Sequence, residues 1–227
     1  MRARDSVIRE RKEAYRDARL IIIASEGKET EKIYFNALAK VFRNPRVHVK
    51  VLERREDEQH NSSPLHVMNQ LNDYKDQYSL EADDELWLVI DKDRWSDAVL
   101  SQVAQKCSQN CNMQMALSNP CFELWLLLHL VNAALLSCEE QQRWLMNQRM
   151  TRRSDPYLKV CLRKEVGSYH ESNYNAEALV INVKDAIARA RELDINPDDR
   201  WPQTLGTRVY LLAESIIRDC REIVRNS

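Results

Sequence analysis

Short, uninterrupted apolar runs recur along the first 137 residues and predict buried strands. Residues 20–24 (LIIIA) and 86–90 (LWLVI) contain no polar position, which is typical of strands covered on both faces, as in a parallel sheet. Residues 47–52 alternate between apolar and polar side chains, and residues 113–117 form another short run. We therefore expect four strands in this part of the chain.

Segments with helical periodicity separate these runs: residues 33–42, Pro64 to Tyr78, and Ser96 to about Cys107. Asn119 and Pro120 then predict the start of another helix, with Asn119 as N-cap and Pro120 at the first helical position. This alternation of strands and helices favours an α/β fold with a mainly parallel sheet and helices on both faces.

The end of the chain has a different pattern. Beyond residue 137 no further strand is predicted, and residues 176–193 and 207–224 have helical periodicity. We expect three regions, with the C-terminal helices packed on the core: a charged N-terminal arm (1–18), an α/β core (19–137) and a helical C-terminal part (138–227).

Composition excludes several classes of protein. Hydrophobic residues make up 44% of the 227 and charged residues 30%, as in a globular chain. The net charge is -1, so a polyanion would have to be held by a local patch or by metal ions. The 3 glycines, Gly27, Gly167 and Gly206, are isolated, which excludes the clustered glycines of a Walker A loop or a dinucleotide-binding fingerprint.

Nothing in the hydropathy pattern indicates a membrane segment. No apolar run approaches the roughly 18 residues that a spanning helix needs. The first residues, MRARDSVIRERKEAYRDAR, have no apolar centre of the kind found in signal peptides. We expect a soluble, cytoplasmic protein.

Acidic residues follow both of the doubly buried strands. Glu26 comes after the first, and Asp91 and Asp93 come after the second. The carboxyl ends of parallel strands meet at one edge of a sheet, where ligands collect, so we expect these side chains to converge. Crowded carboxylates repel one another, and a hard divalent cation removes that repulsion. An extended D-x-D would point Asp91 and Asp93 to one side and Lys92 away.

Each of these acids also has a structural explanation. A helix is predicted to follow Glu26, Glu29 and Glu31, and each of these acids could interact favourably with the positive end of its dipole. Asp91 and Asp93 could be turn residues or a cap for the following helix. The two strand-end positions taken together favour a metal site more strongly than either does alone.

Glu123 lies in a segment that is otherwise apolar on all sides. A buried carboxylate needs a partner, because burying it alone costs several kcal/mol. The partner could be an arginine or the helix dipole, or Glu123 could be a metal ligand or a group that supports the ligands. His129, six residues later, is interpreted as a hydrogen-bonded core histidine.

Three stretches carry a resemblance to a known family. Residues 21–35 read IIIASEGKETEKIYF, residues 87–94 read WLVIDKDR and residues 118–129 read SNPCFELWLLLH. Together with a weaker match at residues 201–210 (WPQTLGTRVY), they are similar to motifs of the RloB-like family. That family is a Toprim-related group found in bacterial restriction and phage-defence loci.

The resemblance implies a Toprim-like fold, with Glu26 as its conserved acid and Asp91 and Asp93 as its D-x-D. It also implies Mg²⁺-dependent phosphodiester chemistry (Mn²⁺ being the alternative ion) and an ATPase as protein partner. Related chains tend to carry a lysine in the segment that matches residues 168–174, where this chain has Glu171.

If that lysine stabilises phosphate charge, its replacement either impairs cleavage or passes the task to a neighbouring lysine. Lys159, Lys164 and Lys184 are the candidates.

The leading hypothesis is a Mg²⁺-dependent Toprim-type nuclease that acts on DNA or RNA as an effector in phage defence. Glu26 would be general base or metal ligand, Asp91 and Asp93 would hold the metal, and Glu123 would support them. One alternative is a non-catalytic regulatory or interaction module. A lower-ranked one is a D-x-D phosphatase, whose motif would follow the first core strand. The choice between DNA and RNA, and whether the chain forms a homo-oligomer, stay open.

Overall fold

The computed structural model describes residues 18–53 and 63–218. Almost all of the expected N-terminal arm, and the end of the last expected helix, lie outside these residues. Within them, no helix is both long enough and apolar enough to cross a bilayer.

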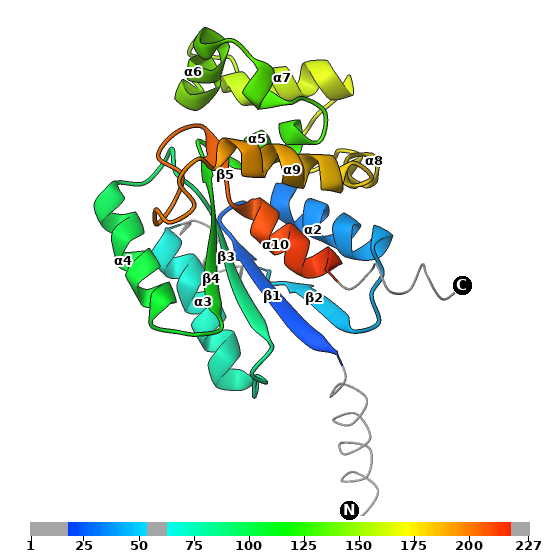
Figure 1. The fold of residues 1–227 in the computed structure, drawn as a ribbon, viewed down its shortest axis with the longest axis vertical. Helices are drawn as coiled ribbons and strands as arrows, with labels where there is room; N and C mark the ends of the chain where they lie inside the picture. Colours follow the sequence, from blue (N-terminus) through cyan, green and yellow to red (C-terminus); the bar gives the residue numbers. More distant parts are fainter. Residues whose placement is uncertain (1–17, 54–62, 219–227) are drawn as a thin grey trace, which may run out of the picture.

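A five-stranded sheet in the order β2-β1-β3-β4-β5 forms the centre of the molecule (Figure 1). Its strands are β1 (Arg19–Ser25), β2 (Val47–Val51), β3 (Glu85–Asp91), β4 (Met113–Asn119) and β5 (Gly206–Thr207). The first four pair in parallel, and β5 is antiparallel to β4. The expected mainly parallel sheet is confirmed. The expectation of no strand beyond residue 137 is wrong, because β5 lies there. This strand has only 2 residues, too few to produce a recognisable hydrophobic pattern.

The strand order changes direction between β1 and β3. From β1 the chain adds β2 on one side, and it then adds β3 and β4 on the other. Ile23 is accordingly paired with both Val51 and Trp87. In open α/β sheets, ligands bind at the carboxyl ends of the strands at such a switch point. Glu26 and Asp91 lie at these ends.

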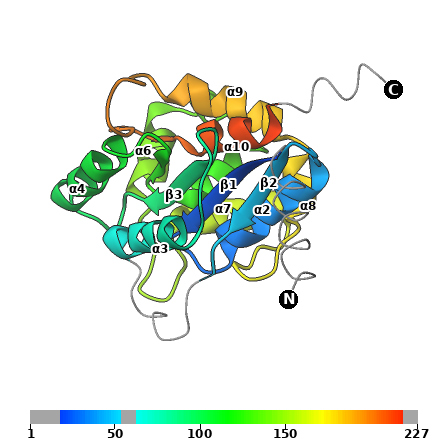
Figure 2. The ribbon, with the colours of Figure 1, turned by 90° about the horizontal axis from the view of Figure 1, so that it is seen from below.

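Helices cover both faces of the sheet (Figures 1 and 2). The described part contains nine α-helices: α2 (Thr30–Val41), α3 (Pro64–Gln77), α4 (Asp97–Ser108), α5 (Phe122–Leu128), α6 (Cys138–Met146), α7 (Tyr157–Val166), α8 (Ala176–Val180), α9 (Val183–Leu193) and α10 (Val209–Ile217). Ile22 and Ala24 of β1 pack with α3 and α4, whereas Ile21 and Ile23 pack with the helices of the opposite face. Burial on both faces accounts for the unbroken apolar run of this strand.

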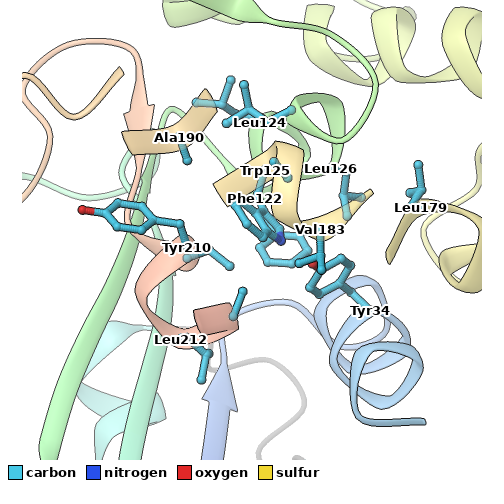
Figure 3. Close-up of a cluster of buried hydrophobic side chains, with 14 of the residues drawn as sticks. Tyr34, Phe122, Leu124, Trp125, Leu126, Leu179, Val183, Ala190, Tyr210 and Leu212 are labelled. Atoms are coloured by element: carbon cyan, nitrogen blue, oxygen red, sulfur yellow. The ribbon is translucent and has the colours of Figure 1, made fainter. Parts of the chain in front are cut away.

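The larger core joins α2 and α5 to the C-terminal helices. Tyr34 of α2, Trp125 of α5, Val183 of α9 and Leu212 of α10 meet in one cluster (Figure 3). The rings of Tyr34 and Trp125 lie edge to face with centroids 6.0 Å apart, a favourable arrangement. The helices α9 and α10 are thus packed on the α/β core, and they help to fix α5 above the sheet.

Two local predictions are wrong. Asn119 is not an N-cap: β4 continues through it, and its Nδ2 donates to the carbonyl oxygens of Pro202 and Thr204, both at 3.0 Å. The helix begins only at Phe122. The segment 176–193 forms two helices, α8 and α9, rather than one. Contacts made by residues distant in the sequence decide the case of Asn119.

Candidate functional site

A pocket of about 440 Å³ lies at the carboxyl ends of β1 and β3. All four site residues predicted from the sequence line it. The full set of acidic residues in its lining is Glu26, Glu29, Glu31, Asp91, Asp93, Glu123 and Glu171. The cations that line the same pocket are Lys28, Arg94 and Lys159. The pocket therefore places acidic and basic groups from distant segments next to one another.

Glu26 is held at the switch point by polar contacts. Its backbone N–H donates to the Val89 carbonyl at 3.1 Å, and its side chain is buried. Its Oε2 accepts a hydrogen bond from Trp95 Nε1 at 2.9 Å. Its Oε1 lies 3.5 Å from Arg94 Nη1 and has no hydrogen-bond partner in the described residues. Burial raises the pKa of Glu26, although the contacts with Trp95 and Arg94 oppose this effect.

Asp91 and Asp93 reach the pocket from a turn. Asp91 is the last residue of β3, after which the Trp95 N–H donates to the Lys92 carbonyl at 3.1 Å. Asp91 thus still belongs to the strand and Asp93 lies in the turn, so the D-x-D is extended only in part. Lys92 lies 3.6 Å from Asp97 in an ion pair and is not part of the pocket lining. Burial raises the pKa of Asp91 well above its usual range, and neighbouring carboxylates, Glu31 first, raise it further.

Glu31 belongs to the pocket, although the sequence analysis assigned it only to the helix dipole. It lies in the first turn of α2, is 4% exposed, and its Oε2 has no hydrogen-bond partner among the described residues. A methyl group on Gly27 would overlap this carboxylate, so the missing side chain lets Glu31 enter the pocket. Burial raises the pKa of Glu31 to about 7, with further contributions from Glu123 and Glu26.

A sequence feature could have revealed Glu31. Gly27 and Glu31 both occur in the first of the stretches on which the family resemblance rests. Their proximity, however, depends on how the turn after β1 leads into α2.

Glu123 contacts a lysine rather than an arginine. It lies in the first turn of α5, where its Oε1 is 3.6 Å from Lys159 Nζ and 3.4 Å from the Tyr169 hydroxyl, which donates to it. Lys159 also pairs with Glu171. Of the three lysines considered above, Lys159 lines the pocket, while Lys164 and Lys184 are exposed.

His129 is a core residue, as the sequence analysis predicted. Its ring nitrogens lie 3.0 Å from the Tyr34 hydroxyl and 2.9 Å from the Trp125 carbonyl. Burial lowers the pKa of His129 to about 4. The ring is therefore neutral near pH 7 and contributes packing to the core.

The pocket fits a hard divalent cation by its chemistry. Across residues 18–53 and 63–218, no group of three or more His, Cys, Asp and Glu side chains is already arranged to hold a metal ion. Two buried carboxylate oxygens, Glu26 Oε1 and Glu31 Oε2, nevertheless lack a hydrogen-bond partner there. Several carboxylates with raised pKa values surround them. Unpartnered carboxylate oxygens of this kind are the ligands that Mg²⁺ and Mn²⁺ prefer.

Comparison with protein families gives one match. The sequence model of the family described as RloB-like protein matches residues 21–216. The matched range includes every acidic residue of the pocket lining. Comparisons with curated proteins and with solved structures found no match.

Proposed function

The chain belongs to the RloB-like protein family, and from this premise we propose that it is a metal-dependent nuclease that hydrolyses phosphodiester bonds of DNA or RNA. One observation carries the proposal: five carboxylates from four segments, Glu26, Glu31, Asp91, Asp93 and Glu123, line one pocket at the switch point of a parallel sheet. We also propose that the sheet is of the Toprim type, with Glu26 and the pair Asp91 and Asp93 as its acids.

Mg²⁺ or Mn²⁺ is the proposed cofactor, and it would be held by Glu26, Asp91 and Asp93 with Glu31 beside them. Bound there, the ion would supply a Lewis acid for a phosphate oxygen and an activated water. Glu123 would act by positioning the ammonium group of Lys159, which lies 3.6 Å from its carboxylate. Glu26, whose pKa is raised by burial, would be a metal ligand or the base that takes a proton from water.

The cations at the pocket suit a negatively charged substrate. Lys159 is 20% exposed in its side chain and is held by two carboxylates, Glu123 and Glu171. Arg94, whose side chain is 62% exposed, lies beside Glu26. We propose that Lys159 stabilises the charge that develops on phosphate, the task expected of a lysine at the position of Glu171.

The proposed biological role is that of an effector in phage defence, working with an ATPase partner. Its support is the family membership and the scarcity of glycine, with 3 in the chain, which leaves nucleotide binding to another protein. Incubation of the purified protein with tRNA and with plasmid DNA, with and without the product of its genomic neighbour, tests this role. No effect of the ATPase on cleavage would argue against the partnership.

One observation favours a second candidate, a non-catalytic regulatory module. Arg94 and Lys159 already neutralise part of the acidic charge of the pocket. A chain of this kind would bind its partner without cleaving nucleic acid.

The decisive experiment compares wild type with Asp91→Asn in a cleavage assay with Mg²⁺ or Mn²⁺. The substitution keeps the shape of the side chain and removes its charge, so we expect cleavage to fall by at least about 10²-fold. Asp83→Asn, at an exposed position before β3, is the matched control and should cleave as wild type does. Equal cleavage by Asp91→Asn would refute the assignment, and no cleavage by wild type in any condition would favour the regulatory module.

A further inference from the structure

Three exposed arginines stand close together between α6 and α7. Arg149, Arg152 and Arg153 lie in residues 148–153, which contain no acidic residue. The nearest acid after them, Asp155, is ion-paired with Arg163 at 2.7 Å. In a chain whose net charge is -1, this segment is a local concentration of positive charge. We refer to residues 148–153 as the basic loop.

The basic loop is anchored at the rim of the acidic pocket. Asn147, which directly precedes the loop, and Pro156, which follows shortly after it, both line the pocket, as does Lys159 in the first turn of α7. Asn147 Oδ1 accepts a hydrogen bond from the Leu158 N–H at 2.9 Å, which closes the segment on itself. Figure 1 shows α6 and α7 beyond α5, at the end of the molecule towards which the parallel strands point. The three arginines are therefore tethered to the pocket through short stretches of chain.

Hydrogen bonds give the basic loop a defined shape. The Thr151 N–H donates to Ser154 Oγ at 2.9 Å, and the Ser154 N–H donates to Thr151 Oγ1 at 3.1 Å. Arg149 Nη1 donates to the Ser154 carbonyl at 2.9 Å. Arg152 and Arg153, by contrast, form no ion pair with any residue in the ranges 18–53 and 63–218. Their guanidinium groups are exposed and available to a ligand.

We propose that the basic loop binds the sugar–phosphate backbone of a nucleic acid strand and holds that strand across the acidic pocket. The inference rests on the proposed function and adds the surface that would hold its substrate. An acidic pocket repels a polyanion, so binding needs cations at the rim to offset the repulsion. A guanidinium can donate two parallel hydrogen bonds to a phosphate. Such contacts position a strand without reading its sequence.

The test is the double variant Arg152→Gln/Arg153→Gln, which leaves the hydrogen bond from Arg149 to the Ser154 carbonyl intact. The control is Arg43→Gln/Lys106→Gln, which removes the same charge at exposed positions near the ends of α2 and α4. Binding of labelled single-stranded RNA, single-stranded DNA and duplex DNA is measured by fluorescence anisotropy in EDTA at several salt concentrations. Circular dichroism and thermal melting check that both variants are folded.

The loop variant should weaken binding by at least about 10-fold at 100 mM salt, while the control changes it by less than about 2-fold. The slope of log K against log salt should fall by about 1.4 for single strands or about 1.8 for a duplex, as two lost phosphate contacts require. Equal slopes for the loop variant and the control would overturn the inference. So would the absence of nucleic acid binding by wild type, which would leave an acidic protein as the ligand of these arginines.

The two proposals can fail separately. If the slope falls for the loop variant but wild type cleaves nothing, the basic loop binds nucleic acid and the nuclease assignment is wrong. If Asp91→Asn abolishes cleavage but the loop variant binds as wild type does, the nuclease assignment holds and the inference about the loop is wrong.

Discussion

At the scale of the residue, Glu31 has the least favourable environment in the pocket. It is 4% exposed, its Oε2 has no hydrogen-bond partner in the described part, and its neighbours include Glu26 and Glu123. These conditions favour the protonated carboxyl, whereas a cation in the pocket would favour the charged form. With a pKa of about 7, Glu31 can change between the two near neutral pH.

This pKa predicts how stability depends on pH without metal. The pKa of Glu31 is raised on folding from 4.5 to about 7, so the folded protein holds the proton more tightly than the unfolded chain does. The free energy of unfolding should therefore fall as pH rises from about 4.5 to about 7 and stay level above that. Glu31→Gln removes the titrating carboxyl, so this decrease in the free energy of unfolding should disappear. The variant should be more stable than wild type by about 3 kcal/mol at pH 8 and by much less at pH 5. Urea unfolding in EDTA at both pH values measures the difference.

Glu165→Gln, at an exposed position at the end of α7, is the control and should show no such dependence on pH. A constant difference between Glu31→Gln and wild type at pH 5 and pH 8 would show that the carboxyl does not titrate in this range.

Lys159 allows a prediction about catalysis. Lys159→Met removes the ammonium beside Glu123 and keeps a side chain of similar length, so cleavage should fall by about 10²–10³-fold. The affinity for Mg²⁺ should not fall, because one positive charge has left the acidic pocket. Lys164→Met, on the same helix but exposed, should cleave as wild type does. If both variants cleave equally, Lys159 has no role in stabilising phosphate charge.

At the scale of the element, the sequence predicts the parallel strands best. Residues 20–24 and 86–90 are apolar throughout because both of their faces are buried, and each is followed by an acid of the pocket. The helices α6 and α7 escaped prediction, since each buries only a few side chains, such as Leu158 and Leu162 of α7. The sequence therefore did not predict that α7 brings Lys159 to the pocket. Three of the four site residues that it did predict, Glu26, Asp91 and Asp93, lie at or just after the ends of strands.

The turn between β1 and α2 provides an element-level test. Gly27→Ala would place a methyl group against the Glu31 carboxylate and displace it. The backbone of Gly27 lies outside the left-handed region, so stability should change by less than about 1 kcal/mol. Affinity for Mg²⁺, measured by titration calorimetry, should fall by about 10-fold or more, because a carboxylate has left the pocket.

Gly167→Ala is the matched control for this turn. Gly167 has a φ of 76° and no heavy atom close to where its Cβ would be. Alanine there should destabilise the protein by about 1–2 kcal/mol through backbone strain and leave the affinity for Mg²⁺ unchanged. The reverse pattern, with affinity for Mg²⁺ lost only in Gly167→Ala, would contradict the claim that Gly27 leaves room for the Glu31 carboxylate.

At the scale of the whole molecule, metal binding and folding are linked. The pocket collects acids from β1, α2, β3 and α5, so a cation bound there stabilises their assembly and has no equivalent site in the unfolded chain. At 100 times its dissociation constant, a ligand contributes about 2.7 kcal/mol. For a domain of this size that corresponds to a Tm increase of about 5–10 °C. Mg²⁺ should give this increase at pH 8 and a smaller one at pH 6, where protons compete with it.

Calorimetric titration of Mg²⁺ or Mn²⁺ into wild type and into Asp91→Asn, at pH 8, tests most directly whether the pocket is a cation site. We predict saturable binding to wild type and a loss of affinity of about 10²-fold or more in the variant. Binding of equal affinity to both proteins, or no binding to wild type, would contradict the account.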